Sequence, residues 1–269
     1  MKKMKLQPKY AFIFTLCLVM IAFEFVPQLK QLPFTSDVAY NRLLSLIIPL
    51  LAGVLAVYMI AAEFGLKLFK KPQHLWVLLP GMVIALDNFP WLAFTQGKMQ
   101  LIHTNSWHFG LFFAYCILVG VFEEILFRGI FFAVLAEVFG RMRKFFFLVY
   151  LLSSVAFGAI HLLNVFTAGP AAFLQAGYSI LTGGLVAFIF ITTKTILFPA
   201  LIHAVYNFCG LLFTQNPGLG AGSVIDLPTA IMMAVISLFV GVFVLYCGWK
   251  YPDDEREQLY NRLNLRKSE

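Results

Sequence analysis

Residues 110–138 read GLFFAYCILVGVFEEILFRGIFFAVLAEV, an apolar run that carries two glutamates and one arginine near its middle. A helix of about 20 residues crosses the hydrocarbon core of a bilayer, so this run is long enough to span a membrane. Because it is longer than required, we expect it to tilt, kink or extend into the cytoplasm before Gly140. A charged group at the centre of a membrane helix costs about 2.5 kcal/mol or more. The three charged side chains must therefore face protein or a wet cavity.

The rest of the chain has the same apolar character. Hydrophobic residues make up 61% of it and charged residues 12%, whereas a soluble domain has about 25% charged residues. The net charge of +7 does not indicate nucleic-acid binding, because the basic residues lie between apolar blocks. Since a helix satisfies its own backbone hydrogen bonds in lipid, the sequence predicts an all-α, polytopic membrane helix bundle.

About eight transmembrane helices are expected, each bounded by charged residues, Pro or Gly. The spans are Tyr10–Val26, Leu43–Ala62, Leu75–Phe94, Gly110–Val138, Phe145–Leu163, Ala172–Thr192, Ile196–Phe213 and Pro228–Trp249. No small-residue cleavage site follows the first, so we expect an uncleaved span there. No repeat or linker divides the chain, which predicts one integral membrane domain over 1–269 with a charged cytoplasmic tail at 251–269, expected to form a short solvated helix.

The distribution of basic residues predicts the orientation. If the N-terminus is cytoplasmic, 16 of the 20 basic residues fall on the cytoplasmic side. Lys30, Arg42 and Lys98 fall outside, and Arg128 lies within a span. Cytoplasmic loops of membrane proteins are rich in Lys and Arg, so both termini are expected in the cytoplasm of a multi-pass cell-membrane protein. The four cysteines all fall within apolar blocks without a close pair and are interpreted as packing residues.

The charged residues of the fourth span suggest how they are paired. Glu124 and Arg128 are i and i+4 on a helix and can form an ion pair, whereas Glu123 points about 100° away. A partly desolvated carboxylate of this kind suits a general base. The alternative is that all three residues form a purely structural polar cluster.

Two histidines lie in later spans. His161 ends the string FGAIH in the fifth span, and His203 and Asn207 share one helix face in the seventh because they are i and i+4. At about 1.5 Å per residue, Glu123 lies about 22 Å and His161 about 24 Å from the cytoplasmic ends of their helices, but His203 only about 10 Å. His203 can meet the other two only if its helix is tilted or shifted.

One carboxylate, two imidazoles and a carboxamide can activate water and stabilise an oxyanion, as peptide hydrolysis requires. Other protease designs are excluded, because the sequence contains neither a His-Glu-x-x-His helix nor a Gly-x-Ser-x-Gly elbow. A paired-aspartate site is excluded too, since Asp87 is the only aspartate well inside a span. Two His and one Glu also form a known zinc set, so Glu123, His161 and His203 are candidate zinc ligands and the question of a metal stays open.

In order along the chain, Glu123-Glu124-x-x-x-Arg128, Phe157-x-x-x-His161 and His203-x-x-x-Asn207 resemble the three motifs of the CPBP intramembrane proteases. This family includes CAAX prenyl proteases of the Rce type and bacteriocin-immunity proteins of the Abi type. The resemblance covers residues 110–213, the protease-like motif core. It implies that Glu123 and His161 activate the attacking water and that His203 and Asn207 stabilise the oxyanion.

The resemblance further implies that Glu124 and Arg128 hold the fourth helix and balance the charge of Glu123. The expected substrate is a membrane-associated peptide or protein, and the compact chain looks more like the bacterial members, in a plasma membrane, which are tied to bacteriocin immunity or peptide maturation. Family members are customarily labelled metalloproteases, so zinc is retained as a candidate cofactor. A noncatalytic immunity or scaffold protein is the main alternative, and a transporter is disfavoured by the lack of internal repeats.

Overall fold

A computed structural model describes residues 38–97, 100–101, 106–139, 143–214 and 227–263. Its elements are α2 (Val38–Glu63), η1 (Leu75–Val77), α3 (Leu78–Asp87), α4 (Trp91–Thr95), β1 (Gln100–Leu101), α5 (Ser106–Glu124), η2 (Ile125–Phe131), α6 (Phe132–Phe139), α7 (Arg143–Ile160), η3 (His161–Asn164), α8 (Val165–Ala168), α9 (Ala171–Thr193), α10 (Leu197–Leu211), β2 (Phe213–Thr214), α11 (Leu227–Trp249) and α12 (Asp253–Arg262). The two strands are short and pair with each other in antiparallel register.

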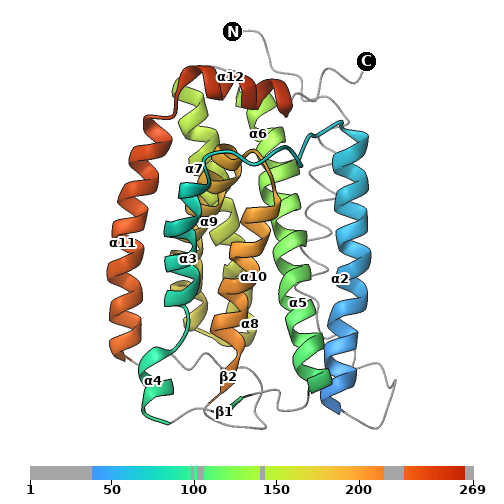
Figure 1. Cartoon of the computed structure of the whole chain (residues 1–269), viewed down its shortest axis with the longest axis vertical. Helices are drawn as coiled ribbons and strands as arrows, with labels where there is room; N and C mark the ends of the chain where they lie inside the picture. The colour runs from blue at the N-terminus through green and yellow to red at the C-terminus, as the bar shows by residue number, and fades with distance from the viewer. Residues whose placement is uncertain (1–37, 98–99, 102–105, 140–142, 215–226, 264–269) are drawn as a thin grey trace.

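The predicted all-α polytopic bundle is confirmed (Figure 1). Within the described residues, five helices are long and apolar enough to cross a membrane: Leu43–Glu63, Ser106–Phe139, Phe146–Asn164, Ala172–Thr193 and Ile231–Trp249. Leu75–Asp87 and Leu197–Leu211 are shorter apolar helices. Seven of the eight predicted spans thus correspond to helices, and the first predicted span, 10–26, lies outside the described residues.

The predicted span Leu75–Phe94 is wrong in its second half. The helix ends at Asp87, and a separate short helix, α4, starts after Pro90. Proline has no backbone N–H to continue a helix and disfavours helical backbone at the residue before it. The chain therefore breaks between Asn88 and Pro90, and α3 is too short to cross a bilayer without neighbours.

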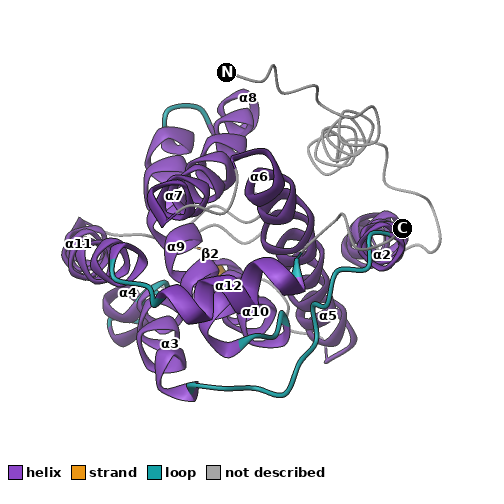
Figure 2. Ribbon diagram, turned by 90° about the horizontal axis from the view of Figure 1, so that it is seen from above, coloured by secondary structure: helices purple, strands orange, loops and turns teal. Residues whose placement is uncertain are grey.

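Two groups of packed helices form the centre of the bundle. α5 packs against α2 and α10, and α7 packs against α9, which also contacts α11. Figure 2 shows these helices end-on. At Gly120 of α5, an added Cβ would lie 2.5 Å from the carbonyl oxygen of Ala200 on α10. Only glycine permits this approach, which brings the segment just before Glu123 directly against α10.

α10 is inset from one end of the bundle (Figure 1). Its first turn lies beneath the segment that links α2 to η1, since Ile196 N donates to Leu68 O and Gln73 N to Thr193 O. Because α10 begins below the end of the bundle, the number of residues between its start and His203 underestimates how far His203 lies from that end. The shifted helix that the sequence required is present.

α12 lies across that same end of the bundle (Figures 1 and 2). Tyr251 stacks on Phe146 at 5.1 Å, and Lys194 Nζ lies 2.8 Å from Glu255 Oε2. Leu259 and Tyr260 are buried. The charged tail does form a helix, but the expectation of a solvated one is corrected, because its apolar face is packed on α7 and α9.

Candidate active site

The helix that carries the two glutamates changes its winding at the site. α5 ends at Glu124 and continues through η2, a π-helical segment, into α6. A π-helical turn inside an α-helix is rare and occurs frequently at functional sites. Glu124, Arg128 and the residues between them are all buried. The expected charged cluster therefore faces the protein interior.

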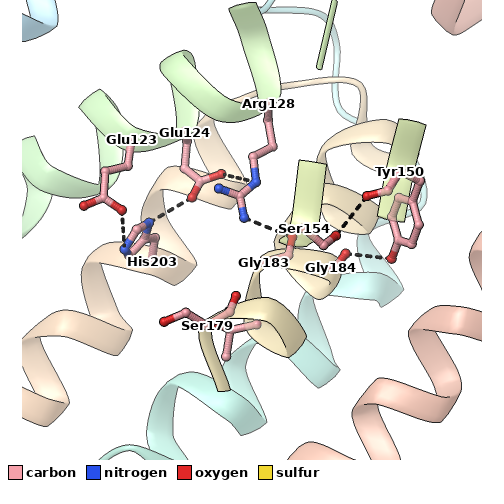
Figure 3. A network of polar contacts seen from close by, with 10 residues as sticks. Glu123, Glu124, Arg128, Tyr150, Ser154, Ser179, Gly183, Gly184 and His203 are labelled. Atoms are coloured by element: carbon pink, nitrogen blue, oxygen red, sulfur yellow. Dashed lines mark hydrogen bonds and ion pairs between the residues drawn. The ribbon is translucent and has the colours of Figure 1, made fainter. Parts of the chain in front are cut away.

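The Glu124–Arg128 pair predicted from spacing is present. Nε of Arg128 lies 3.2 Å from Oε2 of Glu124, and Nη2 of Arg128 donates to the carbonyl of Gly183 on α9 at 2.9 Å. The guanidinium also lies 4.1 Å above the ring of Phe157 on α7. A single fully buried arginine thus links three helices (Figure 3).

His203 lies between the two glutamates (Figure 3). Its Nδ1 donates to Oε1 of Glu124 at 2.8 Å, and its Nε2 is 3.5 Å from Oε2 of Glu123. The second distance is longer than a normal hydrogen bond. Pairing by helix spacing alone left Glu123 apart from Glu124 and Arg128, but the fold places His203 beside both carboxylates. With both imidazole nitrogens protonated, the charges of Glu123, Glu124, Arg128 and His203 sum to zero.

His161 starts the 3₁₀ turn η3 at the end of α7. Its Nδ1 lies 2.8 Å from the carbonyl oxygen of Phe157, one turn earlier. The Phe157 ring contacts both imidazoles edge-on, at 5.1 Å for His161 and 5.7 Å for His203. The two histidines are therefore brought to the same side of the bundle around one aromatic ring.

A cavity of about 270 Å³ joins most of these groups. Glu124, Phe157, His161, His203 and Asn207 all line it. Glu123 does not line the cavity and instead contacts His203. The structure thus gathers all the predicted site residues in one region, with Glu124 rather than Glu123 on the cavity wall.

The comparisons with known proteins bear on this same region. Residues 105–209 match the family model described as type II CAAX prenyl endopeptidase Rce1-like. This central region of the chain is thus similar to Rce1-like CAAX proteases. The match supports an intramembrane endopeptidase of the CPBP type. No curated protein and no solved structure matches the chain.

The cavity is also lined by residues that the sequence reasoning missed. Gln175, Ser179 and Thr182 line the cavity from α9, opposite the histidines. Their spacing of four and three residues places them on one helix face. This polar stripe in an otherwise apolar span is the sequence pattern that could have predicted them. Asn164 Nδ2 donates to Gln175 Oε1 at 2.7 Å and ties η3 to this stripe.

The zinc set does not fit the geometry of the domain. No group of three or more His, Cys, Asp or Glu side chains among the described residues is arranged to hold a metal ion. Both nitrogens of His203 face carboxylates, and Nδ1 of His161 faces a carbonyl oxygen. Zinc bound by Glu123, His161 and His203 would need these contacts to be rearranged. Zinc therefore stays a prediction of the sequence.

Proposed function

We propose that this protein is an intramembrane endopeptidase that hydrolyses a peptide bond in a membrane-associated peptide or protein, with water activated by Glu123 and His161. The observation that carries the proposal is the position of His203, which lies between two carboxylates at the edge of a cavity that His161 and Asn207 also line. A purely structural polar cluster has no need of a cavity beside it. The Rce1-like match over 105–209 supports the same class of reaction.

The tautomer of His161 suits a base. A carbonyl oxygen only accepts hydrogen bonds, so Nδ1 of His161 donates its proton to Phe157 O. In the neutral ring, Nε2 then carries the lone pair. A water molecule held in the cavity can donate to this nitrogen. Nε2 of His161 takes up the proton as the nucleophile forms, and Glu123 can share it only by turning its carboxylate from His203 toward the cavity, which it does not line in this conformation.

His203 suits a donor to the developing oxyanion. The Glu124 carboxylate accepts a hydrogen bond from Nδ1 and thereby orients the imidazole, as buried carboxylates commonly do for catalytic histidines. The contact of Nε2 with Glu123 is long at 3.5 Å, so this N–H can turn to a substrate oxygen at little cost. Asn207 lies one turn further along α10 and lines the cavity, where its amide can give a second hydrogen bond.

Glu124 and Arg128 act as positioning residues in this scheme. Their ion pair is buried, and Arg128 also binds the Gly183 carbonyl. Together they hold α5, α9 and α10 in register around His203. They also supply one negative and one positive charge, which keeps the site neutral when Glu123 is ionised and His203 is protonated.

Bacteriocin immunity or peptide maturation is the biological role that we propose for this hydrolysis. The competing function is noncatalytic immunity, in which the same bundle sequesters a peptide toxin. The two differ in their dependence on Glu123. A protease needs its carboxylate, whereas a sequestering protein needs only the shape of the cavity.

The deciding experiment is cleavage of fluorogenic membrane peptides, both leader-bearing and CAAX-like, by the purified full chain. Glu123→Gln, His161→Ala, His203→Ala and Asn207→Ala are compared with wild type in the same micelles. Removal of one oxyanion donor typically lowers kcat by about 10²–10³, which is the expected loss for Asn207→Ala. Loss of cleavage in the Glu and His variants supports the proposal.

Glu63→Gln is the matched control, because Glu63 is an exposed glutamate at the end of α2, outside the cavity. It should cleave at the wild-type rate. Full cleavage by a well-folded Glu123→Gln protein would overturn the proposed mechanism. No cleavage by wild type, together with toxin protection that survives Glu123→Gln, would favour the sequestering protein.

A further inference from the structure

The cavity is closed toward one end of the bundle and open toward the other. Its wall near Glu124 and His203 is buried, as are Leu185 and Ile202 beside them. Further from α12, the lining residues are partly exposed: His161, Gln175, Tyr178, Tyr206, Asn207, Gly210 and Leu211. His161 begins η3, and the other residues come from the halves of α9 and α10 that point away from α12 (Figure 1). The opening therefore lies at the end opposite α12.

The end that carries α12 is sealed by packed side chains. Every residue of α9 from Leu185 to Ile191 is buried. Tyr251 donates its hydroxyl proton to the Ile191 carbonyl at 3.1 Å and stacks on Phe146. Lys194 is held by both Glu255 and Gln258 of α12. A substrate has no described path to His203 from this side.

The described basic residues lie almost entirely at the sealed end. They are Lys67, Lys70, Lys71, Arg143, Lys144, Lys194, Lys250, Arg256 and Arg262. At the opposite end the described segments contain only Arg42, near the start of α2. Lys and Arg accumulate on the cytoplasmic side of membrane proteins. This asymmetry assigns the sealed end to the cytoplasm and the open end to the outer face.

We propose that the cavity opens to the extracytoplasmic side, so that the substrate is a peptide segment held at the outer membrane surface rather than one presented from the cytoplasm. This proposal rests on the proposed peptidase function for its substrate, but the direction of opening stands on packing and charge alone. It narrows the substrate class to exported or surface-exposed membrane peptides.

Apolar side chains beside the opening fit a substrate that stays in the membrane. Phe173 and Leu174 precede Gln175 on α9 and are 63% and 76% exposed. Leu162 and Leu163 directly follow His161 and are also exposed. These apolar side chains border lipid while the polar mouth at Gln175 faces water. A peptide can therefore reach the cavity along the membrane surface, where its polar backbone meets the α9 stripe of Gln175, Ser179 and Thr182.

The test is labelling of single cysteines with a charged, membrane-impermeant maleimide. The full chain first has its four native cysteines replaced by alanine. Gln175→Cys then reports on the cavity mouth and Thr182→Cys on its interior. Gln96→Cys, in an exposed loop at the open end, and Glu257→Cys, exposed on α12, are the controls for the two faces. Each variant is labelled in intact spheroplasts and in inside-out vesicles.

We expect Gln175→Cys and Gln96→Cys to be labelled in spheroplasts, Thr182→Cys more slowly, and Glu257→Cys only in inside-out vesicles. Labelling of Glu257→Cys from outside would overturn the orientation. Labelling of Gln175→Cys only from inside, or from neither side, would overturn the opening. Because labelling needs no catalysis, an inactive protein with the expected pattern would contradict only the proposed peptidase function.

Discussion

Nδ1 of His203 donates to Oε1 of Glu124 across 2.8 Å, although the two residues are 79 positions apart in the chain. The other oxygen of the same carboxylate is 3.2 Å from Nε of Arg128. One buried glutamate therefore serves both the imidazole at the cavity and the arginine that links α5, α7 and α9. Its removal should affect stability and activity by separate routes.

Glu124→Gln should lower both stability and cleavage. The substitution leaves Arg128 buried without a counter-charge, and breaking a buried ion pair in this way costs about 3–5 kcal/mol. The double variant Glu124→Gln/Arg128→Met removes both charges and should recover much of that stability without recovering activity, since His203 still lacks its carboxylate. Unfolding in mixed micelles measures the change in stability, and a peptide cleavage assay measures the change in activity. A double variant no more stable than Glu124→Gln would contradict this account.

His161→Ala should abolish most activity while leaving the fold intact. His161 is only partly buried, and the hydrogen bond of Nδ1 goes to the preceding turn of the same segment. Its loss should therefore lower the free energy of unfolding by only about 1 kcal/mol. Loss of a general base typically lowers the rate by about 10²–10⁴. His108→Ala, at the start of α5 and away from the cavity, is the control and should retain the wild-type kcat. Equal losses in both variants would show that His161 has no special role.

Gly120→Ala should damage the site from a distance. The new Cβ would lie 2.5 Å from the Ala200 carbonyl oxygen, which forces α5 away from α10, and overpacking of this kind costs about 1–3 kcal/mol. Activity should fall because Glu123 and Glu124 follow directly on the displaced helix. Gly110→Ala is the matched control, since no atom lies within 4 Å of its added Cβ. Its stability should stay unchanged or rise slightly.

Arg262→Met should stabilise the protein. Arg262 is 5% exposed, and its three guanidinium nitrogens have no hydrogen-bond partner among the described residues. Burial lowers its pKa to about 10, so the side chain stays charged at neutral pH at a cost. Its position 4.7 Å above the Phe190 ring offsets this cost only in part. We expect Arg262→Met to raise the free energy of unfolding by about 1 kcal/mol. The control Lys250→Met replaces an exposed cation and should leave the free energy of unfolding unchanged. A loss of stability for Arg262→Met would contradict the prediction.

Chelation should leave cleavage unchanged. The histidine and glutamate donors are engaged with one another or with backbone and do not converge on one point. The wild-type protein is treated with 1,10-phenanthroline and its cleavage rate is measured. The metal content of wild type is then compared with that of the double variant His161→Ala/His203→Ala. Inhibition that added zinc reverses, with metal lost from the double variant, would restore the zinc set of Glu123, His161 and His203.

Much of this fold is readable from sequence because a membrane span is a local property. An apolar block of sufficient length forms a helix in lipid whatever its neighbours are, and seven predicted spans correspond to described helices. The Glu124–Arg128 pair was predictable for the same reason, since i and i+4 residues on a helix are neighbours. Pro90 was a local signal too, and giving it more weight would have ended the third helix at Asp87.

The spacing of residues along the chain does not determine which polar side chains meet, because this depends on how helices far apart in the sequence pack. Helical spacing separated Glu123 from Glu124 and Arg128 and put His203 at a different depth, yet His203 contacts both glutamates. That contact exists because α10 begins inside the bundle and because Gly120 lets α5 approach Ala200. The chain alone thus specified which residues carry charge within the membrane and in what order. The packing of α5, α9 and α10 decided which of them meet, because such contacts depend on side-chain fit between helices far apart in sequence.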